Sequence, residues 1–277
     1  MCNPAIFRVL YRKASKEGIV GMIDFYRFKN LSNEPGCMHA VTKKDPNEPY
    51  ALSLALHTGE ALDEIVANRQ KIILELDLSK KAYFVVADQT HSDHITVITE
   101  PKTKGWEALE NAVADSDALI TDLPGVMLVI LTADCVPILL YDRKKKIVAA
   151  VHAGWKGTRS QIVFKTVEKM VEEYGSEPAD ILAGIAPSIG KCCYEVGENV
   201  AKHFFEIPEA LKPKGKKYRL DLPAVNHYQL LKAGLLENNI ELSGVCTACE
   251  VDFFFSYRKE QGCSGRFMSL IGIMSEQ

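Results

Sequence analysis

The sequence has no apolar run of the roughly 18 residues that a membrane-spanning helix needs. It also has little charge imbalance: a formal net charge of −3 and a pI of about 6.2 give no indication of nucleic-acid or membrane partners. The first residues, MCNPAIFRVLYRK, lack the apolar core of a signal peptide, so we expect a cytoplasmic protein. Because repeats, low-complexity tracts and linkers are also absent, we predict one domain over residues 1–277.

Apolar runs of strand length are the clearest feature that is present. Three of them lie close together, at 126–131, 136–140 and 147–151, and each is rich in β-branched residues. Cys135 follows the first run and His152 follows the third. A thiolate and an imidazole at strand ends are held by rigid backbone, as an active site requires.

Hydrophobic periodicity predicts further elements along the chain. Expected strands lie at 51–59, 83–87, 95–98, 181–185, 253–257 and 267–273. Expected helices lie at 60–76, 158–174, 197–205 and 223–232, and a surface loop is expected at 212–217. Thr158 and Gln161 form a capping-box pattern at the start of the second helix. Mixed strands and helices of this kind predict an α/β (α+β) fold.

Eight cysteines in a chain without a secretory signal favour reduced thiols over a disulfide framework. Cys192 and Cys193, with the pair Cys246-x-x-Cys249, suggest a second zinc site made of four thiolates. However, only one C-x-x-C pair is present, and adjacent cysteines do not easily bind one tetrahedral ion. We therefore interpret these four residues as packing thiols.

His91, in the segment DQTH, supplies a third metal-capable side chain besides Cys135 and His152. Two imidazoles and a thiolate suit Zn²⁺, and three protein ligands leave the fourth tetrahedral position open for water or substrate. A thiol and an imidazole are equally typical of a cysteine nucleophile and its base. The spacing along the chain does not separate these two interpretations.

Four segments occur in a characteristic order: DQTH at 88–91, TADCVP at 132–137, VHAGWKGT at 151–158 and GIAPSIG at 184–190. Together with LHTG before Arg69, and FFSYR and GR near the end, they resemble the laccase-domain family. This family is also called the polyphenol oxidase or peptidoglycan-editing-factor family, and its members are described as purine nucleoside phosphorylases.

The resemblance implies that His91, Cys135 and His152 bind zinc and that Arg69 is an active-site arginine. It further implies phosphorolysis of adenosine, inosine, guanosine and methylthioadenosine to the base and ribose 1-phosphate, with deamination of adenosine. The implied partners are a purine nucleoside and phosphate, without nucleic acid or membrane, for a monomer or small homo-oligomer. The implied fold is a single-domain mixed β-sheet sandwich flanked by helices, similar to the catalytic domain of cytotoxic necrotizing factor.

The chain departs from the family pattern at four positions. Ser53 replaces an asparagine and so loses the paired donor and acceptor of an amide, which affects substrate contacts there. Lys156 replaces an arginine, which keeps the charge but gives up two-pronged binding of an oxyanion. Ala55 and Ala186 stand where the family has glycine. We still expect Arg69, Ser53 and Lys156 to contact substrate or phosphate.

Several other side chains have two readings each. His57 suits an acid–base role or a structural one, whereas His94, His203 and His227 fit surface positions. The remaining candidates are aromatic residues that suit purine stacking or core packing, and arginines that suit anion binding or ion pairing: Trp155, Tyr194, Arg258 and Arg266.

Three alternatives to a zinc phosphorylase stay open. The first is a Cys–His hydrolase or amidase acting on cell-wall precursors, with Cys135 as nucleophile and His152 as base. The second is a copper polyphenol oxidase, which is disfavoured because the seven histidines are scattered and form no His-Cys-His cluster. The third is a non-catalytic scaffold that binds metal.

Overall fold

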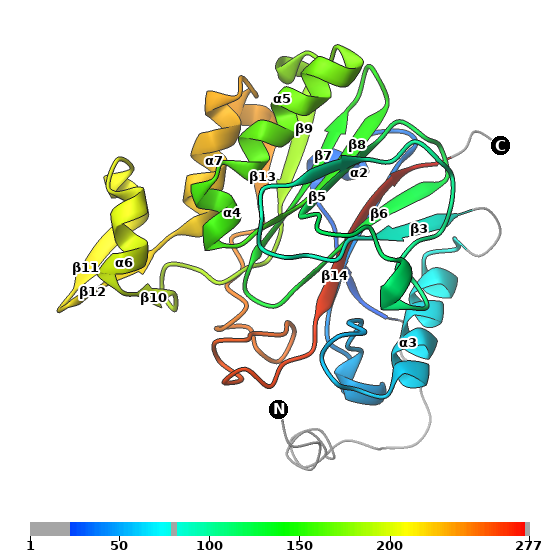
Figure 1. The fold of residues 1–277 in the computed structure, drawn as a ribbon, viewed down its shortest axis with the longest axis horizontal. Coiled ribbons are helices and arrows are strands. Elements are labelled where there is room, and N and C mark those ends of the chain that lie inside the picture. Colours follow the sequence, from blue (N-terminus) through cyan, green and yellow to red (C-terminus); the bar gives the residue numbers. More distant parts are fainter. Residues whose placement is uncertain (1–22, 79–81, 275–277) are drawn as a thin grey trace.

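The structure is a computed structural model that describes residues 23–78 and 82–274. Two β-sheets lie face to face at its centre, and helices cover their outer surfaces (Figure 1). This arrangement confirms the predicted mixed α/β class. Within the described ranges, no helix has the length and apolarity that crossing a lipid bilayer requires.

The first sheet has six strands in the order β13-β9-β7-β8-β5-β4. Its strands are β4 (Ile95–Val97), β5 (Ala118–Thr121), β7 (Val136–Asp142), β8 (Ile147–Ala153), β9 (Ile181–Ile185) and β13 (Ile240–Leu242). Every residue of β7 and β8 is buried, which explains why both strands are apolar over most of their length rather than alternating. Asp142 closes the β7–β8 hairpin by accepting hydrogen bonds from the backbone N–H groups of Lys144 and Lys145.

The second sheet has five strands in the order β1-β2-β14-β6-β3. Its strands are β1 (Phe25–Tyr26), β2 (Cys37–Thr42), β3 (Tyr83–Val86), β6 (Val126–Thr132) and β14 (Phe267–Ile273). Leu128 and Ile130 of β6 point toward the first sheet and pack in one cluster with Leu139 and Val148. Apolar contact between the two sheets therefore forms the central core.

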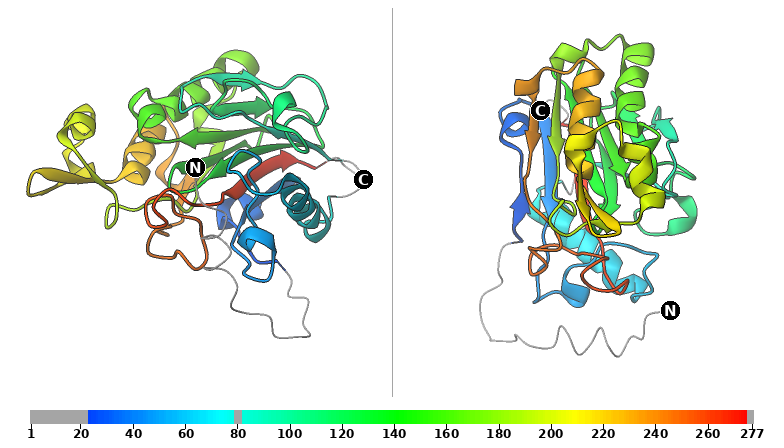
Figure 2. Two further views of the ribbon diagram at one scale, coloured as in Figure 1. Left: turned by 60° about the horizontal axis from the view of Figure 1, so that its bottom comes forward. Right: turned by 90° about the vertical axis from the view of Figure 1, so that its left-hand side faces the viewer.

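Helices cover the two outer faces (Figure 2). On the five-stranded sheet lies α3 (Leu62–Glu75), and on the six-stranded sheet lie α4 (Trp155–Arg159), α5 (Ile162–Tyr174) and α7 (Leu222–Lys232). The apolar face predicted for α5 is buried, and Gly175 ends this helix in the left-handed conformation, as glycine does at a C-terminal cap. The short helix α2 (Lys29–Ser32) contacts β2 and β9.

A small three-stranded sheet projects from one side of the molecule, together with α6 (Glu198–Ala201) (Figure 1, yellow). Its strands are β10 (Glu195–Val196), β11 (Leu211–Lys214) and β12 (Lys217–Leu220), in the order β10-β12-β11. The surface loop predicted at 212–217 is therefore wrong, since this stretch forms most of a hairpin. Its exposed lysines gave it the polarity of a loop.

Three other sequence-based expectations also fail. The alternating stretch at 51–59 is not a strand, because Ala51 and Leu52 adopt positive φ and the leucines pack against α3 instead. No capping box forms at Thr158, because Gln161 has φ of 60° and separates α4 from α5. Residues 253–257 form turns, although Phe254 and Phe255 are buried as expected.

Candidate metal centre and cavity

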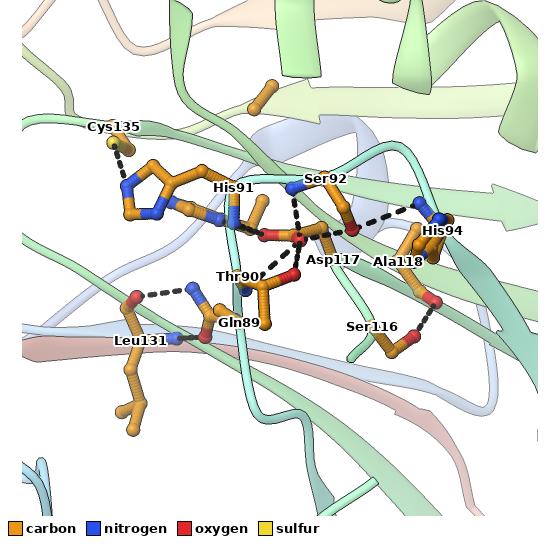
Figure 3. Close-up of polar contacts among 12 residues, drawn as sticks. Gln89, Thr90, His91, Ser92, His94, Ser116, Asp117, Ala118, Leu131 and Cys135 are labelled. Atoms are coloured by element: carbon orange, nitrogen blue, oxygen red, sulfur yellow. Dashed lines mark hydrogen bonds and ion pairs between the residues drawn. The ribbon is translucent and has the colours of Figure 1, made fainter. Parts of the chain in front are cut away.

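The three predicted metal-capable side chains come together at one end of the six-stranded sheet. Figure 3 shows two of them, His91 and Cys135, facing each other. His91 lies just before β4, Cys135 lies between β6 and β7, and His152 lies within β8 rather than after it. One ligand atom from each residue lies within 4.8 Å of the other two. The Sγ atom of Cys135 is 3.8 Å from Nε2 of His91, and the two imidazole rings meet edge to face. We call this set the His–Cys–His triad.

Asp117 holds the triad in position through hydrogen bonds, and Figure 3 shows its contacts with His91 and Ser92. It stands just before β5, is fully buried, and accepts a 2.6 Å hydrogen bond from Nδ1 of His152. The same carboxylate accepts hydrogen bonds from the backbone N–H groups of His91 and Ser92. Because Nδ1 of His152 is engaged, Nε2 is left to face Cys135, which is the arrangement by which carboxylates orient metal-binding histidines.

The same contacts set the ionisation of the triad. Burial alone would raise the pKa of Asp117, but hydrogen bonds from His152 and Ser92 outweigh it and hold the pKa well below its usual range. Burial would likewise raise the pKa of Cys135, but the two neighbouring imidazoles lower it to about 6. A thiol with this pKa is largely ionised at neutral pH, which is the form that binds metal.

The backbone around Cys135 is constrained. Asp134 has φ of 85°, which is rare for a residue other than glycine. Its carboxylate accepts hydrogen bonds from the Thr247 hydroxyl at 2.7 Å and the Arg258 backbone N–H at 2.6 Å. On the other side, a Cβ at Gly154 would lie 3.1 Å from the Cys135 sulfur and 3.0 Å from the His91 ring. A side chain at position 154 would therefore crowd the point where Cys135 and His91 meet.

The triad lines a cavity of about 490 Å³. Aromatic side chains in its wall are Trp155, Tyr194 and Tyr257. Two guanidinium groups also line it: that of Arg258 lies over the Tyr194 ring and that of Arg266 lies over the Tyr257 ring. Among the described residues, neither guanidinium forms an ion pair with a carboxylate. Positive charge without a direct carboxylate partner beside a metal-capable triad suits an anionic ligand.

The other predicted substrate contacts lie outside this cavity wall. Arg69 is buried in α3, and its guanidinium donates to the backbone carbonyls of Leu54, Gly105 and Trp106. Lys156 is exposed on α4. Ser53 is fully buried, and its hydroxyl accepts a hydrogen bond from the backbone N–H of Arg266. The structure thus brings the three triad residues together, whereas Arg69, Ser53 and Lys156 do not line the cavity beside them.

The four remaining candidate histidines occupy separate places. His57 lines the cavity. His94 is exposed, as predicted for a surface residue, and pairs with Asp115, whereas His227 is half-buried, with 20% of its side chain exposed, and pairs with Glu237. His203 stacks on Trp155, with ring centroids 6.3 Å apart. Among these four, His57 alone lines the cavity.

The cysteines give a mixed result. Six carry free thiols, as predicted, and Cys263 is disulfide-bonded. Cys192, Cys193, Cys246 and Cys249, which the sequence led us to interpret as packing thiols, lie together, with one ligand atom of each within 4.8 Å of the other three. We call this set the four-cysteine cluster.

Sequence reasoning missed Asp117, Asp134 and Tyr257. Asp117 precedes a short strand in a polar stretch, and nothing in its neighbourhood distinguishes it from an ordinary turn residue. Asp134 lies next to Cys135 in the segment TADCVP, so its position was the one available signal.

Comparison with known proteins places these observations in a family. The family described as multi-copper polyphenol oxidoreductase laccase matches residues 40–274. Purine nucleoside phosphorylase YlmD of Bacillus subtilis is 36% identical, over 91% of this chain and 94% of its own. Adenosine deaminase RL5, from an unknown prokaryotic organism, is 36% identical over 78% of this chain and 77% of its own.

Solved structures share the fold. The crystal structure of YlmD from Geobacillus stearothermophilus superimposes with a TM-score of 0.84 and 30% identity, covering 92% of this chain and 99% of that one. The hypothetical protein YfiH of Bacillus licheniformis gives a TM-score of 0.80 and 35% identity, covering 86% and 92% of the two chains.

Proposed function

The chain belongs to the multi-copper polyphenol oxidoreductase laccase family, and on this basis we propose that it is a zinc-dependent purine nucleoside phosphorylase that also deaminates adenosine. The observation that carries the proposal is the His–Cys–His triad in the wall of a cavity that also holds two arginines without carboxylate partners. The reaction class is taken from the names of the relatives, and the residue roles are taken from the geometry of the site.

The triad residues fit a zinc ion. Two imidazoles and one thiolate are typical zinc ligands, and three protein ligands leave one position facing the cavity. When bound, zinc lowers the pKa of water and polarises a substrate oxygen. Asp117 would fix the tautomer of His152. Gly154 has no side chain to crowd His91 and the sulfur of Cys135.

Arg258 and Arg266 are proposed to bind phosphate. Phosphorolysis brings a phosphate oxygen to the anomeric carbon while the ribosyl group becomes cationic, so holding the anion in place is a large part of the catalysis. The two guanidinium groups lie 5.2 and 5.8 Å from the centres of tyrosine rings, and both arginines line the cavity. The role implied for Arg69 stays a prediction. All the contacts described for its guanidinium are to backbone carbonyls, which favours a structural role.

The purine nucleoside is proposed to occupy the rest of the cavity. Trp155, Tyr194 and Tyr257 offer flat apolar surfaces for a purine ring. A volume of about 490 Å³ falls within the range of small-molecule sites, roughly 300–1,000 Å³. We propose adenosine, inosine, guanosine and methylthioadenosine as substrates, without ranking them.

A second candidate, the Cys–His hydrolase, rests on one observation. Cys135, His152 and Asp117 follow one another in the order nucleophile, base and orienting carboxylate, with the 2.6 Å hydrogen bond between the last two. Such an enzyme would need no metal and would be inactivated by alkylation of Cys135. Copper in the triad is a third candidate, since one thiolate and two imidazoles also occur in blue-copper sites.

The test uses the full chain, purified with zinc and incubated with adenosine. With phosphate we expect adenine and ribose 1-phosphate, and without phosphate we expect inosine and ammonia. A chelator should abolish both reactions, and added zinc should restore them. Turnover that survives chelation but not iodoacetamide would instead establish the thiol nucleophile, and an intense blue absorption band would establish copper.

A further inference from the structure

The four-cysteine cluster lies on two loops far apart in the sequence. Cys192 and Cys193 follow β9, and Cys246 and Cys249 follow β13. The Sγ atom of Cys249 is 3.6 Å from that of Cys192 and 3.5 Å from that of Cys193. None of the four residues lines the cavity of the His–Cys–His triad.

The sulfur spacing matches a tetrahedral metal ion. Zinc binds thiolate sulfur at about 2.3 Å, so two sulfurs at tetrahedral corners lie about 3.8 Å apart. The separations of 3.6 and 3.5 Å are close to that value, and the largest separation within the cluster does not exceed 4.8 Å. Four sulfur atoms at these separations can surround one ion, as a closed tetrahedral site requires.

Local turns aim the thiols at one point. Cys246 accepts backbone hydrogen bonds from the N–H groups of Cys249 and Glu250, which folds the C-x-x-C segment into a turn. The carbonyl of Gly190 accepts from the N–H groups of Cys193 and Tyr194. The second turn brings two adjacent cysteines to the same partner sulfur, which is the geometry that the sequence alone made improbable.

The cluster has two features of a thiolate site. The backbone N–H of Gly190 donates to Sγ of Cys246 at 3.2 Å, and a hydrogen bond of this kind stabilises the ionised form of a thiol. In addition, a Cβ at Gly190 would lie 3.3 Å from Sγ of Cys192 and 3.2 Å from Cβ of Cys246. A glycine here lets the backbone approach both sulfurs closely.

We propose that Cys192, Cys193, Cys246 and Cys249 bind a second zinc ion in a closed, structural site. With four protein ligands no coordination position remains for water or substrate, so the ion has no part in turnover. Its effect is to add a cross-link between two loops that already meet at the bridge between Ser188 and Cys246, where Ser188 donates to the carbonyl of Val245 and accepts from the N–H of Thr247.

These two loops carry part of the cavity wall. Tyr194 follows directly after Cys193, and Arg258 lies beyond Cys249 in the segment whose Thr247 holds Asp134. The guanidinium of Arg258 lies 5.2 Å from the centre of the Tyr194 ring, so these two wall residues are paired across the loops. The second zinc would thus hold Tyr194 against Arg258 without touching substrate.

The test is metal analysis of the full chain and its variants. We expect two zinc ions per wild-type chain, one in the double variant Cys246→Ser/Cys249→Ser, and one in Cys135→Ser. Cys37→Ser removes a free thiol on β2, away from both clusters, and should keep two ions. Loss of the second zinc should lower the melting temperature by about 5 °C or more.

Two further measurements keep the proposal open to refutation if a variant fails to fold. An organomercurial titrated into wild-type protein should release two zinc ions. Cobalt loaded into Cys135→Ser should give the intense thiolate-to-metal absorption of a site with four sulfurs. One zinc per wild-type chain that is retained in Cys246→Ser/Cys249→Ser, or a disulfide between Cys249 and Cys192 or Cys193 in freshly purified protein, would overturn the proposal. One zinc that is lost in that double variant and kept in Cys135→Ser would instead contradict the proposed zinc at the His–Cys–His triad.

Discussion

The His–Cys–His triad and the four-cysteine cluster invite comparison, because both gather metal-capable side chains from distant parts of the chain within 4.8 Å. They differ in what surrounds them. The triad lines a cavity of about 490 Å³ beside two arginines, whereas no residue of the four-cysteine cluster lines that cavity. The number of ligands and the space beside them separate a site suited to chemistry from one suited to holding loops together.

The supports of the two clusters differ in the same way. Asp117 accepts hydrogen bonds from His152, His91 and Ser92, so a buried charge orients the triad. The four-cysteine cluster has turns and the backbone N–H of Gly190 instead. An orienting carboxylate raises the basicity of a histidine ligand and tunes the metal, whereas backbone turns only fix position.

The sharpest way to break this comparison is to remove one ligand of the triad. Cys135→Ala should lose one of two zinc ions and lower phosphorolysis by more than about 10²-fold, because altering even an outer partner of a ligand typically costs about 10–100-fold. Metal analysis and adenine release measure the two effects. If the variant keeps its full zinc content, Cys135 is not a ligand.

A second experiment contrasts two arginines. Arg266→Ala should raise KM for phosphate by about 10–100-fold, since a hydrogen bond to a charged group contributes roughly 1.5–3 kcal/mol. Arg69→Ala should instead lower the free energy of unfolding by about 3 kcal/mol, because it leaves buried carbonyls without a donor.

Steady-state kinetics against phosphate and urea unfolding measure these two outcomes. Arg143→Ala, on the exposed β7–β8 turn, controls for loss of one charge and should change neither. A selective rise in phosphate KM for Arg69→Ala, with Arg266→Ala unchanged, would mean that Arg69 binds phosphate, as the family resemblance implies, and that Arg266 does not.

The support of the triad can be weakened alone. Asp117→Asn keeps the shape of the side chain but removes its charge, so zinc affinity at the triad should fall by about 10–100-fold. Competition with a chelator of known affinity measures this change. The zinc of the four-cysteine cluster should be unaffected, and an equal loss from both clusters would mean that the change acts through the fold as a whole.

Glycines packed against each cluster offer a matched pair with smaller effects. In Gly154→Ala the new methyl group would press on His91 and Cys135, and in Gly190→Ala it would press on Cys192 and Cys246. Each change should lower zinc affinity about 10-fold at its own cluster only. Site-specific metal content, read in the Cys135→Ser and Cys246→Ser/Cys249→Ser backgrounds, distinguishes the two.

Much of the scaffold follows from local patterns. The apolar runs at 126–131, 136–140 and 147–151 are strands β6, β7 and β8, and each is longer than its run by one to two residues at the C-terminal end. Continuous apolar sequence marked these strands because both of their faces are covered. Helices α3 and α5 were marked by residues at helical spacing, α5 also by Gly175 at its end, and α7 by Pro223 at a first helical position.

What could not be predicted depends on contacts between distant residues. Residues 51–59 have the alternation of a strand, but positive φ at Ala51 and Leu52 turns the chain away from a sheet. Cys192 and Cys249 are 57 residues apart and meet only because β9 and β13 are neighbours. The role of Asp117 is visible only once β5 pairs with β8. That residues 1–277 form one domain stays a prediction.

Strand β14 lies between β2 and β6, although it is the last strand of the described chain. On the ribosome, β2 and β6 therefore emerge long before the strand that pairs with both of them. The elements that carry His91, Cys135 and His152 can pair much earlier, because they are complete by Ala153. We expect nascent chains that stop short of residue 267 to expose two unpaired strand edges and to aggregate. Only translation of the final residues, which form β14, covers both edges.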